Sequence, residues 1–262
     1  MKLKNKKIKK KKKKRKKRRT EKRKKKKSKT NFNIMLNQGH IWEKEYKNPK
    51  LLTKKDKPQA DTLRFFKFLK KEQGYKLTGR TILDLGAGTG RNANYLASLD
   101  NQVIAFEISK EALEIAKQRA KEDGALVDYR LADIGQPYNI ENESIDLVLD
   151  VTSSNSLDEK GRGIYLKEVS RVLKKDGYLF VRALSKEGDK NAQNLLKNNP
   201  AKEKDTYIMP DIKLVERVFS RADFIKTYQP YFKILKLDKK SGYANVGGRL
   251  YKRNYWLAYM QK

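Results

Sequence analysis

Hydrophobic residues in this chain follow two alternating patterns from about residue 80 onward. Short, nearly continuous apolar runs predict buried strands, and segments with apolar residues every three or four positions predict amphipathic helices. The predicted strands are 81–86, 102–109, 126–134, 144–153 and 177–185, and the predicted helices between them are 91–100, 109–124 and 159–177. Strands and helices that alternate at this spacing are typical of βαβ units, so we expect a parallel sheet.

The segments on either side of this core differ from it. Before the first strand, residues 61–71 predict a helix with Leu63, Phe66 and Leu69 on one face, and Phe65 and Phe68 beside them. After the fifth strand, residues 186–216 are polar. The rest of the chain predicts a helix over 220–231 and two strands, 232–240 and 254–262, joined by a loop over 241–253.

These elements define the expected fold. We predict an α/β fold with a doubly wound, mostly parallel seven-stranded sheet and helices on both of its faces. The last two strands close the sheet and give it an antiparallel strand at the C-terminal end. We expect residues 79–185 to form a cofactor-binding core, 35–78 an N-terminal cap and helix, and 186–262 the substrate-side segment and final strands.

A glycine-rich turn follows the first predicted strand in the sequence ILDLGAGTGRN, residues 82–92. Such a turn between a strand and a helix predicts a cofactor site at the edge of the sheet where the parallel strands end. Gly86 and Gly88 match the dinucleotide fingerprint, but its third glycine is replaced by Arg91, and no Gly-Lys-Ser/Thr follows. Asp84 would repel a phosphate and suits a cofactor with positive charge. The turn therefore argues against nicotinamide and nucleotide cofactors.

The motif LDLGAGTG resembles the first motif of class I S-adenosylmethionine-dependent methyltransferases, and the resemblance extends over residues 80–185. It implies S-adenosylmethionine as the cofactor, with Glu107 on the ribose hydroxyls, Asp133 on the adenine amine and Asp150 facing the methyl group. The cofactor-binding residues that we expect are Asp84, Gly86, Ala87, Gly88, Gly90, Glu107, Ile108, Asp133, Ile134 and Asp150.

The residues themselves are compatible with this resemblance. Glycines let the backbone approach a ligand closely, and a carboxylate can hold an ammonium group or accept from two hydroxyls. Two plainer interpretations stay open: the glycines form an ordinary tight turn, and Asp133 only caps a loop.

Asp150 is the candidate catalytic base because it ends the fourth strand. Ser153, Ser154 and Asn155 follow it and could bind the substrate, although the whole run could equally be turn chemistry. Trp42 and Tyr46 lie ahead of the core and could shape the acceptor pocket, or simply pack against the sheet edge. His40 alone does not indicate a general base.

The sequence also limits the acceptor. The chain has no cysteine, which excludes a cysteine nucleophile, and its single histidine argues against a metal site. No [DNS]-P-P-[YFW] motif follows the fourth strand, which disfavours the amino methyltransferases of adenine, cytosine or glutamine. Near the end, GGRLYKRNYW clusters Arg249, Tyr251, Arg253 and Tyr255. These residues could contact an anionic acceptor or nucleic acid, or could alternate on a final strand.

The charge of the chain is concentrated in its first residues. The formal net charge is +33, and residues 1–30 hold 22 of the 64 Lys and Arg residues but only one of the 31 acids. We predict that residues 1–34 are a disordered polybasic tail on a body that begins at Met35. The tail could be an electrostatic arm for nucleic acid or an import signal, or it could be incidental, from a start site assigned too early.

We therefore expect a methyltransferase for a small molecule or a protein side chain. An RNA or ribosome-associated methyltransferase guided by the tail, and a cofactor-binding domain without turnover, are the alternatives. No stretch of 18 apolar residues predicts a membrane span, so the expected location is cytoplasmic, or nuclear or nucleolar if the source is eukaryotic and the tail is real. The oligomeric state is left open.

Overall fold

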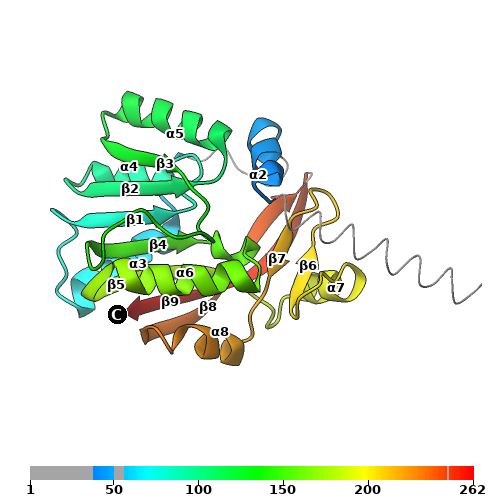
Figure 1. The fold of residues 1–262 in the computed structure, drawn as a ribbon. Coiled ribbons are helices and arrows are strands. Elements are labelled where there is room, and N and C mark those ends of the chain that lie inside the picture. Colours follow the sequence, from blue (N-terminus) through cyan, green and yellow to red (C-terminus); the bar gives the residue numbers. More distant parts are fainter. Residues whose placement is uncertain (1–37, 50–55, 247) are drawn as a thin grey trace, which may run out of the picture. The chain divides into compact units, whose positions relative to one another are not determined.

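The computed structural model describes residues 38–49, 56–246 and 248–262. The predicted tail, residues 1–34, and the predicted start of the body at Met35 lie outside the described residues, so both stay predictions. The described part contains a seven-stranded sheet in the order β3-β2-β1-β4-β5-β9-β8 (Figure 1). The predicted fold, a doubly wound and mostly parallel α/β sheet, is confirmed.

The first four strands of this sheet are short, the last three are longer, and the strands at its centre are mostly buried. They are β1 Thr81–Leu85, β2 Gln102–Glu107, β3 Val127–Leu131, β4 Ile145–Val151, β5 Leu173–Ser185, β8 Lys233–Val246 and β9 Arg249–Gln261. The first five pair in parallel, and β9 runs antiparallel between β5 and β8. The carboxyl ends of β1, β2, β4 and β5 therefore meet along one edge, which we call the carboxyl edge.

Helices cover both faces of the sheet (Figure 1). On one face, α3 (Ala60–Glu72) and α4 (Arg91–Ala97) bury side chains against β1 and β4, and α5 (Lys110–Asp123) lies beside α4. On the other face, α6 (Glu159–Val172) and α8 (Arg221–Tyr228) bury Tyr165 and Phe224. In α3, Phe65, Phe66 and Leu69 are buried as expected, whereas Leu63 is exposed.

Two predicted boundaries are wrong. The helix that we expected over 159–177 ends at Val172, and β5 begins at Leu173 instead of Gly177. Leu173 pairs with Ile145, and the Lys174 ammonium lies 3.0 Å from Asp146, so contacts with β4 draw these residues into the sheet. The loop expected over 241–253 is a continuation of β8 and β9, which pair from Lys233 and Gln261 as far as Val246 and Arg249.

The polar segment after β5 forms a small structured unit. It contains α7 (Lys190–Asn198) and a two-stranded antiparallel sheet of β6 (Thr206–Ile208) and β7 (Val215–Arg217). β7 packs against the 3₁₀ turn η1 (Ser154–Ser156) that follows β4. The unit therefore lies next to the turn where we expected the substrate.

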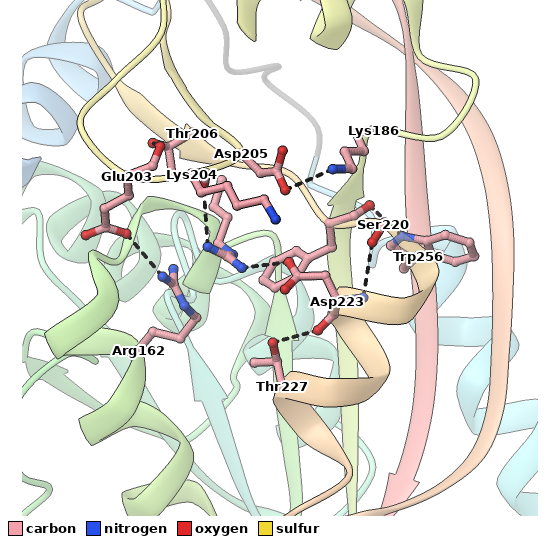
Figure 2. A network of polar contacts seen from close by, with 12 residues as sticks. Arg162, Lys186, Glu203, Lys204, Asp205, Thr206, Ser220, Asp223, Thr227 and Trp256 are labelled. Atoms are coloured by element: carbon pink, nitrogen blue, oxygen red, sulfur yellow. Dashed lines mark hydrogen bonds and ion pairs between the residues drawn. The ribbon is translucent and has the colours of Figure 1, made fainter.

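Ion pairs tie this unit to the core (Figure 2). Arg162 of α6 lies 3.2 Å from Glu203, and Lys186 lies 2.9 Å from Asp205. At the start of α8, Ser220 accepts a hydrogen bond from the Asp223 amide (Figure 2). Trp256 of β9 donates its indole N–H to a backbone carbonyl of the same unit, at 3.0 Å.

An additional helix precedes α3. α2 (Gln38–Lys47) was expected only as a cap segment without defined structure, and it packs beside α5. In the described residues, no helix is long and apolar enough to cross a membrane.

Candidate functional site

The glycine turn after β1 is fixed to the end of β2. The amides of Gly86 and Ala87 both donate to the Phe106 carbonyl, at 2.8 and 2.9 Å. Gly86, Gly88 and Gly90 all have positive φ angles, of 70°, 58° and 81°. Residues with a side chain adopt this conformation at a cost, so the turn requires glycine at these positions.

The three glycines also lie against other side chains. A Cβ at Gly86 would be 2.2 Å from the Ser153 hydroxyl oxygen, and a Cβ at Gly88 would be 2.7 Å from the Tyr46 hydroxyl oxygen. Gly90 is crowded in the same way by Tyr129. The glycine turn therefore contacts side chains from three other parts of the chain, and its close packing depends on the absence of a Cβ at the glycines.

Asp84 is buried directly beneath this turn. Its exposed fraction is 2 %, and its Oδ2 atom has no hydrogen-bond partner within the described residues. Burial raises the pKa of Asp84 to about 7, although the nearby Arg91 guanidinium opposes the shift. A buried carboxylate oxygen without a partner is costly, so it indicates that a donor or cation is missing.

Glu107 ends β2 and lies next to the turn. Its Oε2 accepts the Gly88 amide at 2.8 Å, and its Oε1 accepts the amides of Ile108 and Ser109, each at 2.9 Å. Burial raises the pKa of Glu107, and these backbone donors oppose the shift. Oε2 has the capacity to accept a further hydrogen bond from a ligand.

The helix α2 covers this part of the site. Glu43 accepts the Ser109 hydroxyl at 2.7 Å, and this hydrogen bond lowers the pKa of Glu43 to about 2. Tyr46 reaches Gly88, and burial raises its pKa well above the ordinary value. The Trp42 and Tyr46 rings lie 6.2 Å apart, and Trp42 packs against the hydrophobic core. Tyr46 thus lies at the glycine turn. The contacts of Trp42 favour the interpretation that it packs against the protein core.

Asp133 and Ile134 follow β3. Asp133 is exposed, and its Oδ1 accepts the amide of Gly135 at 2.8 Å. Ile134 is buried among the residues under α6. The hydrogen bond from the Gly135 amide is typical of a residue that caps a loop. The role of Asp133 toward adenine therefore stays a prediction.

Asp150 differs from the expectation for a base that faces the substrate. It is fully buried, and its Oδ1 accepts the amides of Ser153 and Ser154 at 2.9 and 3.2 Å. Its Oδ2 accepts the Tyr165 hydroxyl at 2.9 Å, and burial raises its pKa. These contacts favour the interpretation of Asp150 as a group that shapes the turn, and its proposed catalytic role stays a prediction.

The polar run after Asp150 is divided between the site and the interior. Ser153 lies against Gly86, whereas Ser154 and Asn155 are buried. The Asn155 carboxamide bonds the Thr152 carbonyl and the Leu184 amide. Only Ser153 therefore reaches the glycine turn. Thr152 has a φ of 69°, a strained conformation for a β-branched residue that often marks a functional site.

The basic and aromatic cluster near the end does not act as one surface. Arg253 is buried, and its guanidinium lies 3.1 Å from Glu216 and bonds the Tyr207 hydroxyl. It therefore holds β6 and β7 to β9, which favours for Arg253 the plainer interpretation, alternation on a final strand, over contact with an anionic partner. Tyr255 makes a different contact, because its ring lies beneath the guanidinium of Arg182.

Arg182 and Glu43 are polar residues of this edge that the sequence analysis missed. Arg182 lies within the apolar run of β5, and a single charged residue in such a run could have indicated a polar site at this strand. Glu43 gave no such signal, because its partner Ser109 is 66 residues away.

The site residues fit S-adenosylmethionine. Within the described residues, Asp84 offers a buried carboxylate oxygen without a partner for the ammonium group, the glycines let a ligand approach the backbone closely, and Glu107 can accept from the ribose. When bound, this cofactor supplies an activated methyl group.

Known proteins resemble the chain in sequence and in structure. A family model described as a methyltransferase domain matches residues 83–181. A ubiquinone biosynthesis O-methyltransferase of Pelagibacter ubique is 30% identical over 109 residues, which are 40% of this chain and 42% of that protein. This chain thus spans less than half the length of that relative.

Two solved structures have the same fold. A methyltransferase from Methanosarcina mazei has a TM-score of 0.64 at 21% identity, covering 73% of this chain and 96% of its own. A 1,6-didemethyltoxoflavin-N1-methyltransferase from Burkholderia thailandensis, solved with S-adenosylhomocysteine, has a TM-score of 0.54 at 17% identity, with 78% of each chain covered.

The family model identifies residues 83–181 as a methyltransferase domain, and the motifs and strand order of the chain resemble those of class I S-adenosylmethionine-dependent methyltransferases. S-adenosylmethionine is the cofactor of that class, and the residues of the site fit it.

Proposed function

We propose that this protein transfers the methyl group of S-adenosylmethionine to a hydroxyl oxygen of a small molecule. The observation that carries the proposal is the buried Oδ2 of Asp84, which has no partner in the described part of the chain and precedes a turn of three glycines. A protein that did not bind a cofactor there would gain stability by replacing such an aspartate. The similarity to an O-methyltransferase supports oxygen as the accepting atom.

The reaction is an in-line displacement. The acceptor oxygen donates an electron pair to the methyl carbon, the bond from that carbon to sulfur breaks, and S-adenosylhomocysteine leaves as a neutral thioether. The acceptor hydroxyl loses its proton to solvent or to a nearby base. The protein contributes mainly by aligning the two reactants and excluding water.

The surroundings of Asp150 support an acceptor that needs little help from a base. The two oxygens of Asp150 already accept three hydrogen bonds, from Ser153, Ser154 and Tyr165. An acidic hydroxyl, which loses its proton readily near neutral pH, suits this arrangement. A small molecule is also supported by the sequence DVTSSN after β4, where amino methyltransferases of nucleic acid bases carry a different motif.

The alternative is a methyltransferase that acts on RNA. Its support is the charge of residues 1–30, which hold 22 basic residues and one acid. Electrostatic binding of that kind depends steeply on salt, so it makes a separate prediction.

The two functions can be distinguished in one experiment. The full chain is incubated with S-adenosylmethionine labelled in its methyl group, together with either a small-molecule extract or total RNA. We expect label in the small-molecule fraction and expect Asp84→Asn to abolish it, while Asp128→Asn, on the exposed edge of β3, retains it. Label that enters only RNA, and that falls steeply with added salt, would contradict the proposal.

A further inference from the structure

A cluster of charged residues lies at the carboxyl edge on the far side of β4 from Glu107. Asp61 at the start of α3 is its centre, and its side chain is only 6% exposed. Arg182 of β5 lies 3.1 Å from one Asp61 oxygen, and Lys240 of β8 lies 2.6 Å from the other. Arg64 of α3 also pairs with Asp61. Three cations therefore share one carboxylate.

Asp61 cannot neutralise this cluster further. Its Oδ1 receives Arg64 and Lys240, and its Oδ2 receives Arg182 and the Gln59 carboxamide. With both oxygens already occupied, two positive charges of the cluster have no further partner carboxylate among the residues that the structure describes. Arg64 and Lys240 are partly exposed to solvent, so the excess charge is least screened at Arg182, whose side chain is largely buried.

The Arg182 guanidinium is held in place by two contacts that leave part of its hydrogen-bonding capacity open to a ligand. Its Cζ lies 3.4 Å from the centre of the Tyr255 ring, and its Nε pairs with Asp61. Its two terminal nitrogens have no hydrogen-bond partner within the described residues, and its side chain is 15% exposed. A guanidinium fixed in this way presents a planar pair of donors that suits an oxyanion.

Arg91 adds a further positive charge from the glycine turn. It makes no hydrogen bond or ion pair within the part of the chain that the structure describes. Burial lowers the pKa of Arg91, and the nearby charge of Arg182 lowers it further. The charges of Arg182 and Arg91 therefore oppose each other, and the Asp84 carboxylate offsets part of that repulsion at Arg91.

Arg182 is also well placed for the acceptor. Its neighbour across the sheet is Val151, and the Arg182 carbonyl accepts the amide of Thr152, just before Ser153. Two strand spacings of about 4.8 Å separate β5 from β1, so Arg182 lies roughly 10 Å from the glycine turn. The cluster is thus near the expected position of the methyl group but does not contact it.

We propose that Arg182 binds an oxyanion group of the methyl acceptor, so that the substrate is a carboxylate- or phosphate-bearing small molecule. The inference rests on the proposed function and names its substrate class. The cofactor brings a sulfonium and an ammonium against one carboxylate, so its binding increases the positive charge near Arg182. A negatively charged acceptor is favoured there over a protonated amine.

The test is a binding titration with matched probes. Benzoate, phenyl phosphate and the neutral benzamide are titrated into the full chain loaded with S-adenosylhomocysteine, which already fills the subsite of the cofactor carboxylate. We expect one of the two anions to bind at least about tenfold more tightly than benzamide, since charge-assisted pairs with arginine are the strong ones. The preferred anion distinguishes a carboxylate from a phosphate.

Variants assign the effect to a residue. Arg182→Gln should remove the preference for the anion while S-adenosylhomocysteine still binds, because Asp61 keeps Arg64 and Lys240. Arg182→Lys keeps the charge and should restore part of the preference. Arg130→Gln, an exposed arginine paired with Asp128 on β3, is the control and should behave as the wild type.

Several results would overturn the inference. They are equal affinity for the anions and benzamide, no binding of any probe, or an anion preference that survives in Arg182→Gln. Failure of S-adenosylhomocysteine to bind would instead contradict the proposed function. In that case the same titration of the unloaded chain still decides whether Arg182 binds an anion.

Discussion

Strands β1 and β4 both carry a buried aspartate near their carboxyl ends, but the two carboxylates differ in how fully the protein satisfies their hydrogen-bonding oxygens. Asp84 has an oxygen without a partner, whereas the oxygens of Asp150 accept three hydrogen bonds from its own turn and from α6. Leu83 and Leu85 lie beside Val148 and Asp150 in the sheet, so the two aspartates are only about one strand apart. An unsatisfied group indicates a ligand, and a satisfied group indicates a structural role.

The strongest way to break this comparison is to remove Asp150. Asp150→Ala leaves two buried amides and the Tyr165 hydroxyl without an acceptor, so we expect a loss of about 3–5 kcal/mol in the free energy of unfolding. Urea denaturation measures the loss. Asp146→Ala, at the other end of β4, is the control and should cost less, since Asp146 is partly exposed. Equal losses would contradict a special role for Asp150.

Replacing Asp84 should have the opposite effect and increase the free energy of unfolding at high pH. Its pKa is about 7 in the folded protein and near 4 in an unfolded chain, so between these values the folded state holds a proton that the unfolded state has released. The contribution of Asp84 to stability is therefore fully present below pH 4 and is lost as the pH rises through 7. Without cofactor, Asp84→Asn should be about 2–4 kcal/mol more stable than the wild type at pH 8, and similar to it at pH 4.

Urea denaturation of both proteins at the two pH values measures this difference. A wild type that is as stable as Asp84→Asn at pH 8 would mean that the carboxylate is satisfied by the protein, and the distinction from Asp150 would disappear.

The attachment of α2 should matter less. Glu43→Gln weakens the hydrogen bond to Ser109, and a loss of about 1 kcal/mol corresponds to roughly fivefold faster hydrogen exchange in α2. Mass spectrometry of exchanged peptides measures this rate. Glu114→Gln, an exposed residue on α5, is the control. Unchanged exchange in α2 would show that packing alone holds the helix.

The smallest effect is expected at Tyr46. Tyr46→Phe removes the hydroxyl above Gly88 and keeps the ring, so affinity for S-adenosylhomocysteine should fall by about threefold or less. Calorimetry measures the affinity. A loss beyond about tenfold would make the hydroxyl a direct ligand of the cofactor.

The sequence predicts the cofactor half of the site better than the acceptor half. Asp84 and Glu107 end strands that their apolar pattern identifies, and parallel strands bring such ends to one edge. Local pattern is sufficient there, because each residue acts from its own strand end.

The other half depends on contacts between distant segments. Arg182 acquires its role from Asp61, 121 residues away, and from Tyr255 in the last strand. The sequence left open whether Arg253 contacts an anion or alternates on a final strand, and its buried partner Glu216 lies in a segment whose structure the sequence did not define. The start of β5 was misplaced for the same reason, because pairing with β4 overrides the helical pattern of residues 173–176.

The most direct test of the account is calorimetric titration of S-adenosylhomocysteine into the full chain, Asp84→Asn and Glu107→Gln, with Asp128→Asn as control. The account predicts micromolar binding by the wild type and the control, and at least about tenfold weaker binding by the other two. No binding by the folded wild type, or equal binding by all four proteins, would contradict a cofactor held by the glycine turn and these two carboxylates.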